Sequence, residues 1–313
     1  MIHLDERTFV QLASIPRLKG SIQIVHTNDH SLRCPPESEA ATMPLLQLNG
    51  FSLHYEESGT GTPVLMLHGL GSSGRDWELV APGLEAHHRV IVPDVRGHGR
   101  SGKPAGAYGV PLFARDIAAL CDRLGLANVH VVGLSMGGMI AFQLAVDRPE
   151  LVRSLTIVNS GPDMVPRTMR MRLALAARVL LLKSLGPKRF ARMLAPKLFP
   201  KPEQAELRQR VEEAIGANEP DAYMRATRGL VGWSVLARLK EISCPVLVLA
   251  SDRDYTPLSA KKAYVDLLAN ARLQVVTDSG HASPMDQPGQ LIDAVKAFLL
   301  ELEGPARDTR SLG

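Results

Sequence analysis

The stretch that decides the fold is NVHVVGLSMGGMIAFQLAVD, residues 128–147. It begins as an almost wholly apolar run, which is typical of a strand buried on both faces. After Ser135 it continues as an apolar run of helical length. Between the two lies the pattern G-x-S-x-G, with Gly133 and Gly137 each two positions from the serine. Strand, G-x-S-x-G and helix predict a sharp turn that presents Ser135 as a nucleophile; a serine that only fills a tight turn is the alternative.

The two glycines have a steric explanation. Side chains at Gly133 and Gly137 would collide with neighbouring backbone in such a strained turn, and glycine avoids that collision. The helix that starts at the serine also places positive partial charge where a developing anion would lie.

The same rhythm of strand and helix recurs along the chain. Six apolar runs alternate with helix-like stretches: residues 63–68, 89–94, 128–135, 151–159, 244–251 and 271–277. This alternation predicts an α/β fold with a doubly wound, mostly parallel sheet and right-handed crossovers. Ligands bind beyond the carboxyl ends of the strands in such sheets, so we look for the chemistry in the residues that follow each strand.

The rhythm divides the chain into parts. We predict a core of residues 43–161 and 245–302, beginning with a hairpin around Asn49-Gly50. Residues 162–244 carry no clear strand and hold sixteen Lys and Arg against eight Asp and Glu, so they are expected to form an inserted helical cap. Residues 1–42 are expected to be a loose arm or no part of the native protein, and residues 303–313 a flexible tail.

Composition narrows the class of protein. The net charge is +4 with a pI of about 9.0, and no run of like charges indicates nucleic-acid binding. The three cysteines are widely spaced without a CxxC pair, which argues against a disulfide framework or a zinc site. No apolar run reaches the length of a membrane span and no signal peptide is evident. We expect a cytoplasmic enzyme without metal or cofactor.

A serine nucleophile needs a base and an acid that orients the base. His281 is the only histidine after Ser135 and directly follows a predicted strand, so it is the expected base. The acid should follow the strand 244–251, where Asp254 is preferred over Asp252. Asp163, after the strand before it, is a further alternative.

Acyl transfer also needs donors for an oxyanion. The backbone N–H groups of Met136, directly after the nucleophile, and of Leu70, in the loop HGLG, are the expected donors. His68 begins that loop and is expected to brace it. Trp77 is a candidate for the wall of the substrate pocket, although ordinary core packing explains it equally well.

These motifs together resemble the α/β-hydrolase fold superfamily. The resemblance rests on LHGLGSSGRDW, VPDVRGHGRSGKP, GLSMGGMIAFQLAVDRPELVRSLTIVN, PVLVLASDRDYTP and DSGHASPMDQP, in this order. It implies the triad Ser135, Asp254 and His281, and it is greatest to carboxylesterases, enol-lactone hydrolases and haloperoxidase-like esterases without a cofactor. Carbon–carbon hydrolases of ring-fission products usually have an aromatic residue after the histidine, where this chain has Ala282.

Three classes of function remain open. The first is a serine hydrolase that acts on a small-molecule ester or lactone, as a monomer or homodimer. The second is a carbon–carbon hydrolase with the same triad, and the third is a binding protein built on a hydrolase fold, which a complete triad argues against. Fold alone does not choose among them.

The cap contains one stretch with helical apolar spacing, residues 167–183. The apolar positions are Met169, Leu173, Ala176, Val179 and Leu180, while Arg170, Arg178 and Lys183 are expected to face water. The stripe is expected either to pack on the core or to roof the active site, where the basic cap would attract substrates with a carboxylate.

Overall fold

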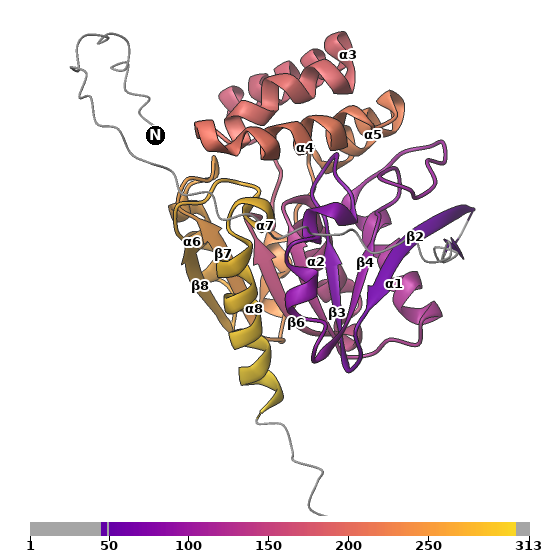
Figure 1. The fold of residues 1–313 in the computed structure, drawn as a ribbon, viewed down its shortest axis with the longest axis vertical. Coiled ribbons are helices and arrows are strands. Elements are labelled where there is room, and N and C mark those ends of the chain that lie inside the picture. The colour runs from indigo at the N-terminus through magenta and orange to yellow at the C-terminus, as the bar shows by residue number, and fades with distance from the viewer. Residues whose placement is uncertain (1–44, 49, 305–313) are drawn as a thin grey trace, which may run out of the picture. The chain divides into compact units, whose positions relative to one another are not determined.

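A computed structural model of the protein describes residues 45–48 and 50–304. An eight-stranded sheet runs through it in the order β1-β2-β4-β3-β5-β6-β7-β8 (Figure 1). The strands are β1 (Leu45–Leu48), β2 (Phe51–Ser58), β3 (Thr62–Leu67), β4 (His88–Pro93), β5 (Val129–Leu134), β6 (Val152–Val158), β7 (Val246–Ser251) and β8 (Ala271–Val276). All six apolar runs that the sequence singles out form strands, and all six pair in parallel. The predicted doubly wound α/β sheet is thus confirmed.

The first two strands form the antiparallel edge of the sheet. Leu48 pairs with Phe51 across the predicted turn, and Gly50 has a φ of 86°. A positive φ is available to glycine without a steric cost, which fits its place in a tight hairpin. β2 then joins the parallel strands by pairing with β4 in the antiparallel sense.

Helices cover both faces of the sheet. One face packs against α1, α2 and α6 in a large apolar core that includes Phe113, Ile140 and Tyr264. The other face packs against the short helix η1 and the long helix α8, with Trp77 and Phe298 at its centre. The bounds are η1 (Gly74–Trp77), α1 (Val110–Arg123), α2 (Met136–Asp147), α6 (Leu258–Val265), α7 (Ser283–Asp286) and α8 (Pro288–Glu303). Two covered faces explain why the central strands are apolar throughout.

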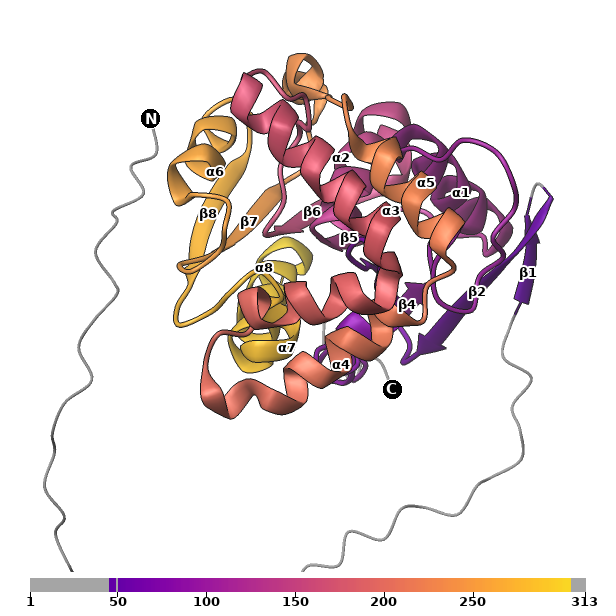
Figure 2. The same cartoon turned by 90° about the horizontal axis from the view of Figure 1, so that it is seen from above.

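Residues 162–244, termed the cap segment, connect β6 to β7 and lie across the carboxyl ends of the strands (Figures 1 and 2). Their main helices are α3 (Met169–Leu198), α4 (Ala205–Gly216) and α5 (Pro220–Leu230). α3 bends at Gly186, whose φ of 69° is not helical, and Pro187 follows. A small apolar cluster contains Phe190 and Tyr223 of this segment together with Ala282 from outside it. That the cap segment forms a separate domain stays a prediction.

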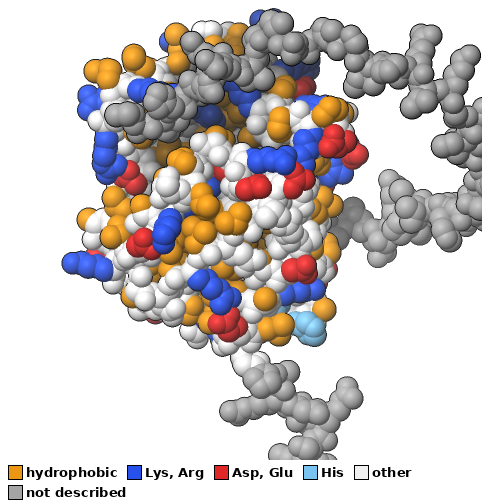
Figure 3. All heavy atoms as spheres, turned by 90° about the vertical axis from the view of Figure 1, so that its left-hand side faces the viewer, with side chains coloured by type: hydrophobic (Ala, Val, Ile, Leu, Met, Phe, Trp, Pro, Cys, Tyr) orange, Lys and Arg blue, Asp and Glu red, His pale blue; other side chains and the backbone are white. Residues whose placement is uncertain are grey.

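The chain ends lie largely outside the described residues. The predicted arm, 1–42, falls there entirely, and so does most of the predicted tail. Glu303 is a correction, because it is the last residue of α8 and its carboxylate lies 3.5 Å from His88 and 3.4 Å from His130. No helix in the described part combines the length and apolarity that crossing a membrane requires. On the face shown in Figure 3, basic, acidic and hydrophobic side chains of the described residues are intermingled.

Candidate active site

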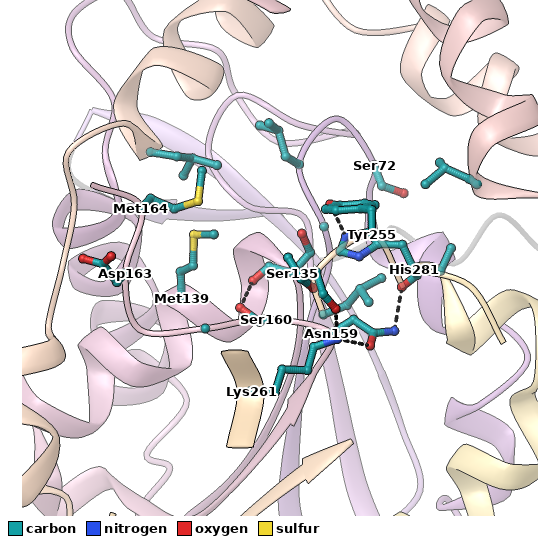
Figure 4. A pocket seen from close by; sticks show the side chains of 18 of the residues that line it. Ser72, Ser135, Met139, Asn159, Ser160, Asp163, Met164, Tyr255, Lys261 and His281 are labelled. Carbon is teal, nitrogen blue, oxygen red and sulfur yellow. Dashed lines mark hydrogen bonds between the residues drawn. The ribbon is translucent and has the colours of Figure 1, made fainter. Parts of the chain in front are cut away.

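A cavity of about 720 Å³ lies where the carboxyl ends of the strands meet the cap segment. Ser135, Asn159 and His281 line it from the sheet side (Figure 4). Its wall on the cap side is mainly apolar and includes Leu175, Leu194, Leu198, Val211, Ile215 and Leu230. Position and lining are those of a small-molecule site.

Ser135 occupies a strained turn between β5 and α2. Its φ is 51° and its ψ is −111°, a conformation that residues with a side chain seldom adopt. A Cβ atom at Gly133 would lie 2.4 Å from the carbonyl oxygen of Gly137, and one at Gly137 would lie 2.1 Å from the carbonyl oxygen of Leu67. The predicted steric need for both glycines is therefore present, and such strain is common where a side chain is held for function.

His281 and Asp254 form a hydrogen-bonded pair. The Nδ1 atom of His281 lies 2.8 Å from Oδ1 of Asp254, whose side chain is fully buried. Burial alone would raise the pKa of Asp254, but the hydrogen bond and charge of His281 and the hydrogen bonds of Lys261 and Thr256 hold the pKa at about 2. The carboxylate is thus ionised and fixes the ring orientation of His281.

Tyr255 stands between this pair and Ser135, and the sequence reasoning did not single it out. Its hydroxyl lies 2.8 Å from Nε2 of His281, and the two rings are 4.2 Å apart (Figure 4). Burial raises the pKa of the Tyr255 phenol, and the nearby Ser135 side chain opposes that rise. No direct hydrogen bond joins Ser135 to His281 in the described structure. The phenol therefore holds the place that a serine hydroxyl takes in a catalytic triad.

Lys261 is the second group that the sequence did not indicate. Its ammonium, on α6, lies 2.5 Å from Oδ2 of Asp254, and both side chains are buried. It also donates to Oδ1 of Asn159 at 3.2 Å and to the carbonyl oxygen of Thr256 at 3.3 Å. In the sequence it belongs to a Lys-Lys pair, which is typical of a solvent-exposed surface.

The two alternative acids have other partners. Asp252 accepts hydrogen bonds from the backbone N–H groups of Asp278 and Ser279, at 2.9 and 3.0 Å. It therefore braces the loop that carries His281. Asp163 is bound by Arg167 and is drawn apart from His281 (Figure 4). Of the three acids considered, Asp254 alone contacts the imidazole.

Asn159, at the end of β6, ties the loops together. Its amide nitrogen donates to the hydroxyl of Ser251 at 2.8 Å and to the carbonyl oxygen of His281 at 3.0 Å. Its φ of 45° points the side chain into this junction. The rule that chemistry follows the strand ends could have indicated Asn159 and Tyr255, since both follow a strand of the sheet.

Of the two predicted oxyanion donors, Leu70 borders the cavity and Met136 directly follows Ser135, which also borders it. Met136 is the first residue of α2, and Leu70 lines the cavity. Within the described structure, the N–H group of neither residue has a hydrogen-bond acceptor. His68 braces the Leu70 loop as expected, because its Nε2 accepts from the N–H of Val95 at 2.9 Å. Asp76 adds a second brace by accepting from the N–H of Gly69, the residue before Leu70, at 2.9 Å.

Trp77 does not form a wall of the substrate pocket, which was one of its two predicted roles. Its side chain is fully buried in the core between η1, the sheet and α8, and it does not line the cavity that contains Ser135. It belongs to η1, which turns the indole toward the sheet. The core-packing explanation thus fits the structure.

The apolar stripe of the cap is also corrected. Met169, Leu173 and Leu180 are 66%, 63% and 63% exposed, so this face neither packs on the core nor roofs the cavity. Leu175 and Arg178 face the cavity in their place. The sequence predicted the helical spacing, but it did not predict which face of the helix is buried.

Within residues 45–48 and 50–304, no cluster of three or more His, Cys, Asp or Glu side chains could hold a metal ion.

The comparison with known proteins agrees with the fold. A family model described as the α/β-hydrolase fold matches residues 62–182. "Putative carbamate hydrolase RutD" of Variovorax paradoxus is 34% identical over 263 residues, which covers 81% of this chain and 98% of that protein. The chain belongs to the α/β-hydrolase fold superfamily, and it is a hydrolase.

Solved structures extend the comparison. An esterase from Thermogutta terrifontis, studied with malate bound, is 28% identical and has a TM-score of 0.74 over 81% of this chain and 95% of its own. The enol-lactonase from Burkholderia xenovorans is 22% identical, with a TM-score of 0.76 over 82% and 99%. At that identity the second likeness concerns the fold alone.

Proposed function

We propose that the protein is a serine hydrolase that cleaves a carboxylic ester or lactone through an acyl-enzyme intermediate. Ser135 is the nucleophile, His281 the general base and Asp254 the acid that orients the base. The observation that carries the proposal is the strained Ser135 turn, which opens into the same cavity as the His281–Asp254 pair.

The reaction starts with an exchange of hydrogen bonds. Tyr255 lines the cavity and is 66% exposed, so we propose that its ring rotates and frees Nε2 of His281. Nε2 then accepts the proton of the Ser135 hydroxyl while Oγ attacks the carbonyl carbon of the ester. The oxyanion receives hydrogen bonds from the N–H groups of Leu70 and Met136.

The intermediate collapses by breaking the bond between the carbonyl carbon and the alcohol oxygen. The imidazolium of His281 gives its proton to that oxygen, and the alcohol departs from the acyl-enzyme. Water then attacks the acyl carbon, with His281 as base, and the acid is released from Ser135. For a lactone, the alcohol and the acid remain one molecule.

The size of the cavity favours esters and lactones of medium length. The cavity measures about 720 Å³ and has a mainly apolar wall, which suits an acyl chain of several carbon atoms. The RutD relatives are named carbamate hydrolases, so a carbamate belongs in the substrate test. The solved esterase from Thermogutta terrifontis, at 28% identity, supports ester cleavage as the reaction class. Carbon–carbon hydrolysis stays the second candidate because it uses the same triad.

A substrate panel tests the proposal. It contains p-nitrophenyl esters of increasing chain length, a set of lactones, a simple carbamate and a ring-fission dienoate, each with wild type and Ser135→Ala. We expect the highest kcat/KM for medium-length esters or lactones and a loss of about 10³-fold or more in Ser135→Ala. Turnover of the dienoate or the carbamate alone would overturn the assignment of substrate class.

A further inference from the structure

Arg178 is a charged side chain of the cavity that the proposed mechanism does not use. It lies on α3, is half-buried and lines the cavity. Its guanidinium carbon is 5.2 Å from the centre of the Phe190 ring, so the cation rests on an aromatic face. Within the described part of the chain no carboxylate pairs with it. A guanidinium keeps its charge at any physiological pH and cannot relieve burial by losing a proton.

The other charged groups that line the cavity are compensated. Lys261 is paired with Asp254, and Asp163 is paired with Arg167. Asp76 is hydrogen-bonded to the Gly69 N–H group, and burial raises the pKa of its carboxyl group. Within the described residues, Arg178 therefore adds one positive charge without a carboxylate partner to the mainly apolar wall on the cap side of the cavity.

The surroundings of Arg178 hold it in place. The rings of Phe190 and Tyr223 pack edge to face, with centroids 6.4 Å apart. Burial raises the pKa of Tyr223, and the nearby Arg178 charge opposes that rise. The Arg178 charge likewise opposes the rise that burial causes in the pKa of Tyr255, the neighbour of Ser135. The guanidinium thus packs on the aromatic ring of Phe190, and it belongs to α3, on the cap side of the cavity.

We propose that Arg178 is the binding residue of a carboxylate subsite, so that the preferred ester or lactone carries a second, ionised acid group. The inference rests on the proposed function and names its substrate class. The planar guanidinium forms two parallel hydrogen bonds with a carboxylate. The pair is desolvated by the apolar wall around it, which strengthens the attraction.

Matched substrates test the subsite. Mono-p-nitrophenyl adipate ends in a carboxylate where p-nitrophenyl hexanoate ends in a methyl group, and the pairs based on glutarate and suberate vary the length. The ratio of kcat/KM for the anionic and the neutral ester is measured for wild type and Arg178→Gln. Arg170→Gln is the control, because it removes the same charge from an exposed position of the same helix.

For at least one length we expect wild type to prefer the anionic ester. Arg178→Gln should lower the ratio by about tenfold or more and leave the neutral ester within about twofold. Arg170→Gln should leave the ratio within about twofold, because an exposed charge is screened. A ratio that Arg178→Gln does not change, or that both variants lower equally, would overturn the subsite.

A binding measurement separates this inference from the proposed function. Monomethyl adipate is titrated calorimetrically into Ser135→Ala, with and without Arg178→Gln. If no ester is hydrolysed but Arg178→Gln weakens binding by about tenfold, the subsite stands and the proposed function fails. If esters are hydrolysed and binding is unaffected by Arg178→Gln, the function stands and the subsite fails. Without detectable binding to Ser135→Ala, the subsite also fails.

Discussion

The ammonium of Lys261 supports the hydrogen-bonded pair of His281 and Asp254 through its contact with the carboxylate. Its nitrogen lies 2.5 Å from the carboxylate oxygen that does not face the imidazole. An opposite charge at this distance stabilises the ionised carboxylate, and the hydrogen bond from Lys261 lowers the pKa of Asp254. We therefore expect Lys261 to support catalysis by keeping the carboxylate that orients His281 ionised.

Lys261→Met tests this expectation. With the ammonium removed, the buried carboxylate of Asp254 loses a hydrogen bond that lowers its pKa, so kcat should fall by about tenfold. Lys262→Met is the matched control, because the neighbouring side chain is exposed and pairs only with Asp266 on the surface. Circular dichroism and the melting temperature confirm folding of both variants. An unchanged kcat in folded Lys261→Met would contradict this role.

At the scale of elements, the turn from β5 to α2 is fixed by close backbone packing. The chain passes so near the end of β3 that Gly137 faces the carbonyl group of Leu67 without room for a methyl group. The hydroxyl of Ser160 also donates to the carbonyl oxygen of Ser135 at 2.6 Å. The position of the nucleophile thus depends on three neighbouring strand ends.

Gly137→Ala should therefore destabilise the fold by about 3 kcal/mol, because a Cβ only 2.1 Å from a backbone oxygen forces the turn to move. Gly289→Ala is the control, since that glycine lies in α8 with open space around it. There alanine should change the free energy of unfolding by less than about 1 kcal/mol. Urea titration measures both. Equal effects of the two substitutions would show that the turn has no special packing.

α3 shows that the sequence of a helix alone does not predict which of its faces is buried. Both Leu173 and Leu180 on one face and Leu175 and Leu182 on another fit a helical period, so the period does not choose the buried face. Tertiary contacts choose it, and Leu182 is 3% exposed whereas Leu180 is 63% exposed. The central strands were predictable because burial on both faces makes them mainly apolar.

For the whole molecule, the order of motifs predicted the fold and which acid contacts His281. His281 and Asp254 follow adjacent parallel strands, β8 and β7, and so their meeting follows from topology. Lys261 and Arg178 were not predictable in this way. Each is one basic residue among many on its helix, and only the packing of α6 or α3 against the sheet side or the cavity distinguishes it.

The central claim is that Ser135 is the nucleophile, and covalent labelling tests it most directly. A fluorophosphonate should react with one residue, in the tryptic peptide 124–153, which contains Ser135 as its only serine. Labelling should abolish ester hydrolysis in proportion to the adduct, and Ser135→Ala should remain unlabelled. An adduct on any other peptide, or full labelling of folded Ser135→Ala, would contradict the account.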